Sequence, residues 1–114
     1  MEGADTKPYG NIPISGPRTS LLHGIPSSRA IGYGDLVLMD YGCQYHGYLS
    51  DMTRTVVVGR ATKKQREVYG LEQRMVEAVE AFLKDDVSAA EAYEESRRIL
   101  EGTEWACLCM RRPL

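Results

Sequence analysis

The sequence changes character at Thr62, and this change limits the fold more than any other feature. Up to Gly59, glycine and proline divide the chain into short segments, and two of these, Leu36 to Met39 and Thr53 to Val58, are rich in apolar or β-branched residues. Such punctuation is typical of strands joined by turns. After Thr62 the apolar residues recur at helical spacing instead. Strands followed by helices predict an α+β fold.

Two helices are expected in the second half of the chain. Thr62 with Gln65 and Ser88 with Glu91 both have the spacing of a capping box, which marks the start of a helix. The second helix is expected to run to about Leu100. The apolar stripe of the first helix consists of Val68, Leu71, Met75, Val79 and Phe82.

Composition argues against several classes of partner. A net charge of −2 gives no reason to expect nucleic acid or an anionic membrane surface. The apolar runs are far shorter than the ~20 residues that span a bilayer. The three cysteines, Cys43, Cys107 and Cys109, lack the spacing of a disulfide framework, which predicts reduced thiols and a cytoplasmic location.

Two aspartates lie near the central turn. If that turn is centred on Tyr45 and His46, Asp40 stands directly opposite Asp51 on the neighbouring strand. Directly opposed residues have Cβ atoms about 4.5–5.5 Å apart, where two like charges are destabilising. A divalent cation would neutralise both carboxylates. The alternative is that both residues simply flank turns, where aspartate is common.

Three other polar residues near these strands leave alternatives open. His23 lies in a loop rich in glycine and proline, and such a residue is either a catalytic group or a solvent-facing side chain. His46 is expected to be exposed at the hairpin tip. Arg54 is either an ion-pair partner or a surface charge.

Five segments follow one another along the chain: Ser15 to Ser20, His23 to Ser27, Gly34 to Gly42, Gly47 to Val56 and Val58 to Gly59. In order and spacing, this set resembles the pita-bread metallopeptidases, the family of aminopeptidase P, prolidase, methionine aminopeptidase and creatinase. The resemblance extends from about Tyr9 to about Glu101, and it is closest to the proline-directed members. It implies the N-terminal part of a pita-bread α+β domain, with an antiparallel hairpin-rich sheet followed by two helices.

The resemblance also implies roles for three residues. Asp40 and Asp51 correspond to the first two of five metal ligands, with Asp51 bridging two ions, and His23 corresponds to a catalytic histidine of the substrate pocket. Family members use two divalent ions, often manganese and in some cases cobalt or zinc. A metal-bound hydroxide then attacks the peptide, which carries proline in its second position.

The chain departs from the family in two ways. Leu22 stands where the family usually has another residue, often proline, before the histidine. The later ligands, a histidine in a Gly-His-Gly segment and two glutamates, have no counterpart here. The chain is therefore expected to be an inactive fragment of a dinuclear Xaa-Pro aminopeptidase or prolidase. The alternative is a non-catalytic pita-bread binding module.

Three regions are expected along the chain: a disordered segment at residues 1–8, a partial catalytic domain at 9–101 and a non-native tail at 102–114. Back-translated and read one base earlier, the tail can encode the family's Gly-His-Gly segment, which suggests a frameshift. Trp105, Leu108 and Met110 would then pack poorly. An uncovered sheet edge also predicts self-association.

Overall fold

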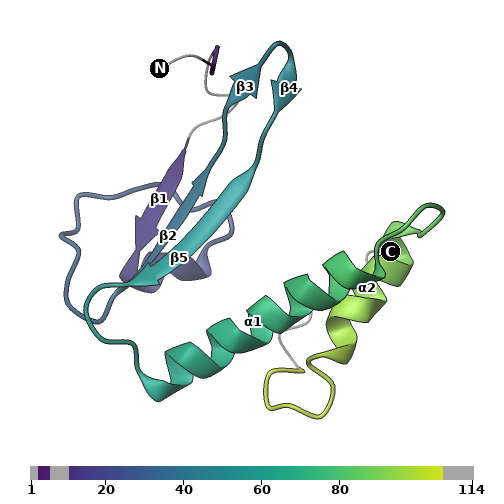
Figure 1. The fold of residues 1–114 in the computed structure, drawn as a ribbon. Coiled ribbons are helices and arrows are strands. Elements are labelled where there is room, and N and C mark those ends of the chain that lie inside the picture. The colour runs from purple at the N-terminus through teal and green to yellow at the C-terminus, as the bar shows by residue number, and fades with distance from the viewer. Residues whose placement is uncertain (1–2, 6–10, 107–114) are drawn as a thin grey trace. The chain divides into compact units, whose positions relative to one another are not determined.

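We analysed a computed structural model, which describes residues 3–5 and 11–106. The chain divides into two compact units, Met1–Thr62 and Lys63–Leu114. The first unit contains the strands and the second contains the α-helices (Figure 1). The α+β class predicted from the sequence is confirmed.

The first unit is built on a three-stranded antiparallel sheet (Figure 1). Its strands lie in the order β1 (Ile12–Ser15), β2 (Leu36–Tyr41) and β5 (Met52–Val57). Two short strands, β3 (Gln44–Tyr45) and β4 (Tyr48–Leu49), lie at the far end of the β2–β5 hairpin. The β2–β5 pair and the β3–β4 pair have the same register, so these four strands form a single long hairpin with an interruption.

The hairpin turns at His46 and Gly47, one residue later than the sequence interpretation placed it. Tyr45 pairs with Tyr48, which leaves a two-residue loop. His46 has a φ of 47° and Gly47 a φ of 85°. Two positive φ values are what a type I′ hairpin turn requires, and glycine adopts them at little cost. A tip at Tyr45 and His46 is wrong because it would transfer a positive φ to Tyr45.

The core of the first unit centres on Ile14, which is 2% exposed. Ile14 pairs with Leu38, and Ile12 pairs with Asp40, so these four side chains share one face of the sheet. A short 3-10 helix, η1 (Gly16–Ser20), follows β1 and packs against β1 and β2. One apolar face of the sheet thus extends from Ile14 toward Asp40.

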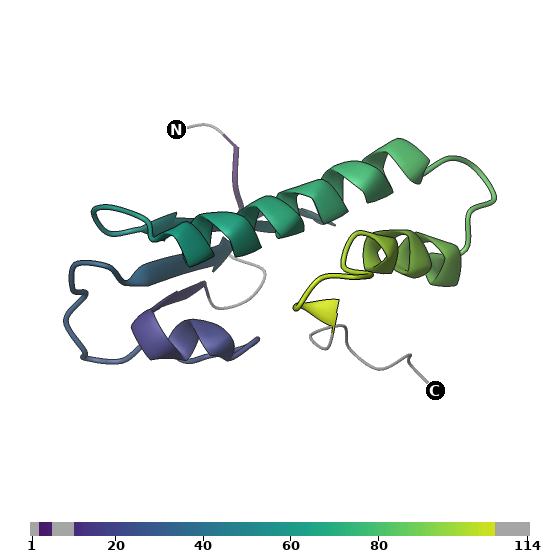
Figure 2. The same cartoon turned by 90° about the horizontal axis from the view of Figure 1, so that it is seen from below.

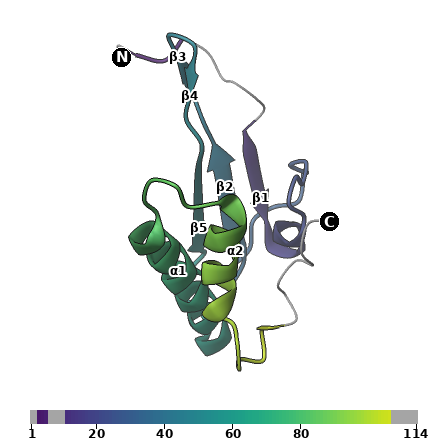
Figure 3. The same ribbon diagram turned by 90° about the vertical axis from the view of Figure 1, so that its right-hand side faces the viewer.

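The second unit is a pair of helices, α1 (Lys63–Phe82) and α2 (Ala89–Arg98), which pack side by side (Figures 2 and 3). Leu71 and Leu100 are buried in this unit. The predicted apolar stripe is confirmed, since its other members, Val68, Met75, Val79 and Phe82, are half-buried. Within residues 3–5 and 11–106, no helix is long and apolar enough to span a membrane.

The start of α2 is the capping box that the sequence predicted. The Glu91 amide donates to Ser88 Oγ at 3.2 Å, and the Ser88 amide donates to Glu91 Oε2 at 2.9 Å. The hydroxyl and the amide of Ser88 both stabilise the charged carboxylate and hold the pKa of Glu91 below its ordinary value. Two otherwise unpaired helix-end amides are satisfied in this way.

The two ends of the chain are described only in part. Asp5 lies within the segment expected to be disordered, yet its amide donates to the Gln44 carbonyl at 2.8 Å and its Oδ2 accepts from the His46 amide at 2.7 Å. Trp105 is half-buried, with Lys64 Nζ 4.7 Å from its ring centroid and its indole nitrogen buried without a hydrogen-bond partner. Leu108 and Met110 lie outside the described residues, so the poor packing of the tail stays a prediction.

Candidate metal centre

Asp40 contributes a buried acceptor to the sheet face described above. It lies near the end of β2 and is half-buried. Its Oδ1 atom is buried and has no hydrogen-bond partner. Leaving such an acceptor without a donor costs about 1–3 kcal/mol, and more when the group is charged. A cation bound to this oxygen would remove that cost.

The partner of Asp40 across the hairpin is Thr53, not Asp51. The prediction of directly opposed aspartates is therefore wrong, and the cause is the turn at His46 and Gly47. Moving the tip by one residue shifts every cross-strand partner by two. A two-residue shift keeps each side chain on its original face, because side chains alternate with a period of two.

Asp51 lies just before β5 and is exposed. The strand register continues past Asp51, since the Ser50 amide donates to the Cys43 carbonyl at 2.9 Å. Continued by one residue beyond its last pair, Tyr41 with Met52, this register places Asp51 opposite Gly42 and makes Asp40 its diagonal neighbour.

Diagonal neighbours on one sheet face lie about 7–8 Å apart, compared with about 4.5–5.5 Å for direct partners. Their charges therefore repel less than those of opposed residues. A cation with metal–oxygen distances of about 2.0–2.6 Å can still be reached from both sides.

The ladder is irregular directly beside Asp51. The Cys43 amide donates to the side-chain Oγ of Ser50 at 3.0 Å instead of to a backbone carbonyl. Cys43 Sγ lies 3.3 Å from the same oxygen. This irregularity lies between the paired residues of β2 and β5 and those of β3 and β4.

Asp40 and Asp51 fit two ligands of a metal site, as an unpaired buried oxygen and a carboxylate in the diagonal position. Across the part of the chain that the structure describes, no group of three or more His, Cys, Asp or Glu residues could hold a metal ion. The assignment of Asp40 and Asp51 as metal ligands therefore stays a prediction.

His23 is exposed in the loop that follows η1. The next residue, Gly24, is buried against the core. A Cβ atom on Gly24 would lie 3.2 Å from Ile14 Cδ1 and 3.1 Å from Leu21 Cβ, so only glycine fits there without displacement. Because Ile14 shares the face that carries Asp40, the His23 loop is seated on that same face.

Sequence reasoning assigned no role to Arg18, which holds this loop closed. Its Nε and Nη2 atoms donate to the Ile25 carbonyl at 2.9 and 2.6 Å. Its own carbonyl accepts from the Leu21 amide at 3.0 Å. The only signal in the sequence is an arginine a few residues before the histidine.

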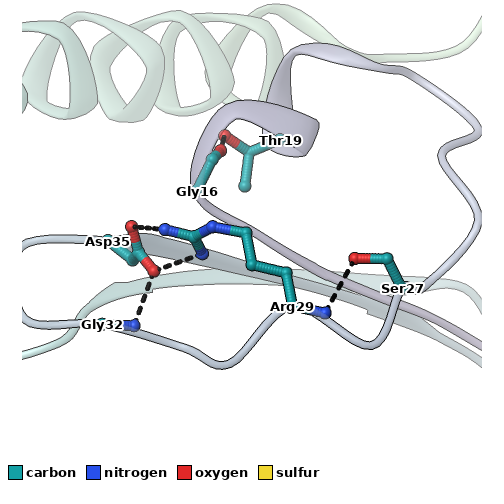
Figure 4. Close-up of polar contacts among 6 residues, drawn as sticks. All are labelled: Gly16, Thr19, Ser27, Arg29, Gly32 and Asp35. Atoms are coloured by element: carbon teal, nitrogen blue, oxygen red, sulfur yellow. Dashed lines mark hydrogen bonds and ion pairs between the residues drawn. The ribbon is translucent and has the colours of Figure 1, made fainter.

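A second arginine, Arg29, closes the next segment with a bidentate ion pair (Figure 4). Arg29 Nη1 and Nη2 lie 2.6 and 2.9 Å from the two carboxylate oxygens of Asp35. The Gly32 amide also donates to Asp35 at 2.7 Å. The hydrogen bonds from Arg29, and then that from Gly32, hold the pKa of Asp35 below its ordinary value.

Gly16 completes this cluster. It has a φ of 58°, and a Cβ atom there would lie 2.8 Å from Arg29 Nη1 and 3.0 Å from Asp35 Oδ1. The start of η1 and the ion pair therefore pack together closely, as Figure 4 shows. Sequence reasoning assigned no role to Asp35, which it named only within the matching segment Gly34 to Gly42.

The remaining two polar residues are surface groups. His46 is exposed at the hairpin tip, as predicted, and its ring makes an edge contact with Tyr45. Arg54 is exposed, and its Nη1 donates to the Thr53 carbonyl at 2.8 Å. Of the two alternatives for Arg54, the surface charge is the one observed.

Comparison with known proteins gives a consistent result. The family model "Metallopeptidase family M24" matches residues 1–110. The Xaa-Pro dipeptidase of Pyrococcus furiosus is 40% identical over 105 residues, which is 89% of this chain and 29% of that protein. The Xaa-Pro aminopeptidase of Escherichia coli is 36% identical over 99 residues, or 86% of this chain and 22% of that protein.

Solved structures show the same likeness. Recombinant prolidase from Thermococcus sibiricus superposes with a TM-score of 0.90 and 33% identity, covering 97% of this chain and 30% of that one. The chain thus spans less than a third of the length of each of these relatives. The expected fold, the N-terminal part of a pita-bread domain, is confirmed.

Proposed function

The chain belongs to metallopeptidase family M24, and on this premise we propose that it supplies Asp40, Asp51 and His23 to a dinuclear metal-dependent peptidase site. The observation that carries the proposal is the buried Oδ1 of Asp40, which has no donor, on the face where the His23 loop is seated. A carboxylate oxygen in that state is suited to a hard cation.

Each of the three residues has one role. Asp40 and Asp51 would hold the metal ions, with Asp51 shared between them, and His23 would line the substrate pocket. The ions are divalent, and we propose manganese. When bound, they lower the pKa of a water molecule and polarise the carbonyl oxygen of the scissile bond.

The proposed substrate is a peptide with proline in its second position. Support comes from the relatives, which carry the names Xaa-Pro dipeptidase and Xaa-Pro aminopeptidase. A cytoplasmic location is part of the proposal and rests on the absence of disulfide-framework spacing among the three cysteines.

We propose that the 114-residue chain by itself does not hydrolyse peptides. Two carboxylates cannot fix two ions, since each hard divalent ion takes about six ligands and water alone does not orient the pair. With added manganese or cobalt we expect no cleavage of Xaa-Pro peptides. Turnover that disappears in Asp51→Ala would show that the chain forms a complete site.

Metal binding is tested on the full chain by the electron paramagnetic resonance signal of free Mn²⁺. Asp40→Asn and Asp51→Asn are each expected to weaken Mn²⁺ binding at least tenfold, because each removes a charged ligand. Asp85→Asn, an exposed aspartate of the second unit, is the matched control and should bind as the wild type does. Equal binding by all four proteins would overturn the metal proposal.

We also propose that the chain self-associates through β5, an edge strand of the sheet. An edge strand presents unpaired backbone groups to other chains. Val56 on this strand is 49% exposed. Sedimentation velocity over a range of concentrations should show association, and Val56→Lys should reduce it, because a charge on an edge strand opposes pairing. A wild-type monomer at all concentrations would contradict this.

A further inference from the structure

We propose that Arg18 is a positioning residue that holds His23 over the sheet face carrying Asp40. This inference rests on the role proposed above for His23. In this role Arg18 acts through the loop that it closes and not by contact with the reacting groups.

Arg18 forms hydrogen bonds with both ends of the segment from Leu21 to Ile25. The backbone carbonyl of Arg18 accepts from Leu21, three residues on. Its guanidinium reaches across the loop and donates twice to the Ile25 carbonyl, at 2.9 and 2.6 Å. Hydrogen bonds from a charged donor are about twice as strong as neutral ones, and a planar guanidinium places its donors in a fixed geometry. His23 lies between these two fixed points.

A third contact sets the height of the loop above the sheet. Gly24, directly after His23, is seated on Ile14 without room for a Cβ atom. Ile14 pairs with Leu38, and Asp40 is two residues further along the same strand. That step is about 7 Å, from a rise of about 3.3 Å per residue. The loop therefore meets the sheet at Ile14, whose partner Leu38 is one such step from Asp40.

Burial of side chains does not hold the loop in the way that it holds the sheet. Leu22 and Ile25, on either side of His23, are 78% and 75% exposed. Apart from Gly24, the segment from Leu21 to Ile25 is exposed to solvent. Its position must then depend on hydrogen bonds, and two of these come from the Arg18 side chain.

The experiment uses the full 114-residue chain and nuclear magnetic resonance with a trace of Mn²⁺ as a paramagnetic probe. Mn²⁺ at the carboxylates broadens nearby proton signals steeply with proximity. The chain has two histidines, so His46 at the hairpin tip is an internal reference for His23. The measured quantity is the broadening of the His23 ring signal divided by that of the His46 ring signal.

In the wild type we expect this ratio to be well above one. Arg18→Gln, which removes the charged fork, should lower it at least threefold while the amide of Thr53, opposite Asp40, is broadened as before. Arg18→Lys keeps the charge but cannot donate from two fixed nitrogens, and should lie between. Arg60→Gln, an exposed arginine in the same unit, is the control and should not change the ratio.

A metal-free measurement separates this inference from the metal proposal. We expect amide hydrogen exchange at Leu21 and Gly24 to quicken at least tenfold in Arg18→Gln and not in Arg60→Gln, while the Ile14 methyl signal keeps its position. If Mn²⁺ broadens neither Asp40 nor Thr53, the metal proposal fails, and the exchange rates alone decide the role of Arg18. If Arg18→Gln does not fold, Arg18→Lys is judged by the same measurements. An unchanged ratio and unchanged exchange in a folded Arg18 variant would overturn the inference.

Discussion

The β2–β5 hairpin and the Arg18–Ile25 loop meet at Ile14, but they are held in place by different physical means. Asp40 is placed by six consecutive paired residues, so its position is shared among many backbone hydrogen bonds. His23 is placed by the two bonds of one guanidinium and by the seat of Gly24 on Ile14. A single substitution that displaces His23 should therefore leave the positions of the carboxylates unchanged.

The two regions share Ile14, and its truncation should have the largest effect. Ile14 is 2% exposed and touches both the sheet core and the loop. Ile14→Ala should lower the free energy of unfolding by about 3 kcal/mol, from lost burial and the cavity left behind. Urea unfolding followed by circular dichroism measures it.

Val56→Ala is the control for that change, since Val56 is 49% exposed and lies on the opposite face. It should cost well under half as much, because little apolar surface leaves the protein interior. Equal costs for the two variants would mean that Ile14 is not the common support of hairpin and loop.

Gly24→Ala should affect the loop and leave the hairpin register intact. The added methyl group would lie 3.1–3.4 Å from Leu21, Ile14 and Arg18 atoms, which forces a local shift. We expect a loss of about 1–3 kcal/mol, the usual cost of overpacking. Gly70→Ala in α1 is the matched control with opposite sign, because its Cβ meets only the end of Arg74 and alanine favours the helix by about 1 kcal/mol.

If Gly24→Ala were as well tolerated as Gly70→Ala, the loop would not be seated closely on Ile14. Cross-strand nuclear Overhauser effects between Asp40 and Thr53 should persist in Gly24→Ala. Their loss would show that the loop and the hairpin are not separable.

The hairpin itself is tested at its turn. Gly47 has a φ of 85°, and Gly47→Ala should cost about 1 kcal/mol or more because alanine is strained there. His46→Asn should have a smaller, stabilising effect, since asparagine suits the first position of a type I′ turn. Thermal unfolding measures both. A stabilising Gly47→Ala would contradict the observed turn.

The local features of this fold could be read from sequence. The start of α2 was predictable because Ser88 and Glu91 contact each other three residues apart, with no help from the rest of the chain. The helical stripe around Leu71 was predictable for the same reason. The hairpin was predictable too, but its tip depended on whether Gly47 or Tyr45 takes a positive φ.

The site itself could be predicted only as a set of residue types. The face shared by Asp40 and Asp51 follows from alternation, and it survives the two-residue error in register. The buried state of Asp40 Oδ1 does not follow, because it depends on packing by other segments. The bonds from Arg18 to Ile25 join a side chain and a carbonyl seven residues apart, and no periodic pattern marks such a contact.

The smallest expected effect is a pH dependence of stability at Asp35, which accepts hydrogen bonds from Arg29 and Gly32. These bonds hold the folded-state pKa of Asp35 below its ordinary value of 3.8. The stability that they contribute is therefore complete above pH 3.8 and is lost as the pH falls through the lower, folded-state pKa. Because the Arg29 side chain is 43% exposed, solvent screening keeps the effect small.

The Gly32 amide signal should titrate with a midpoint below 3.8, and Arg29→Gln should raise that midpoint, since the bonds from Arg29 are the largest cause of the shift. Asp35→Asn should abolish the titration. A wild-type midpoint at or above 3.8 would mean that the Arg29–Asp35 ion pair does not form in solution. The histidine loop would then be held by Arg18 and Gly24 alone, without support from that ion pair.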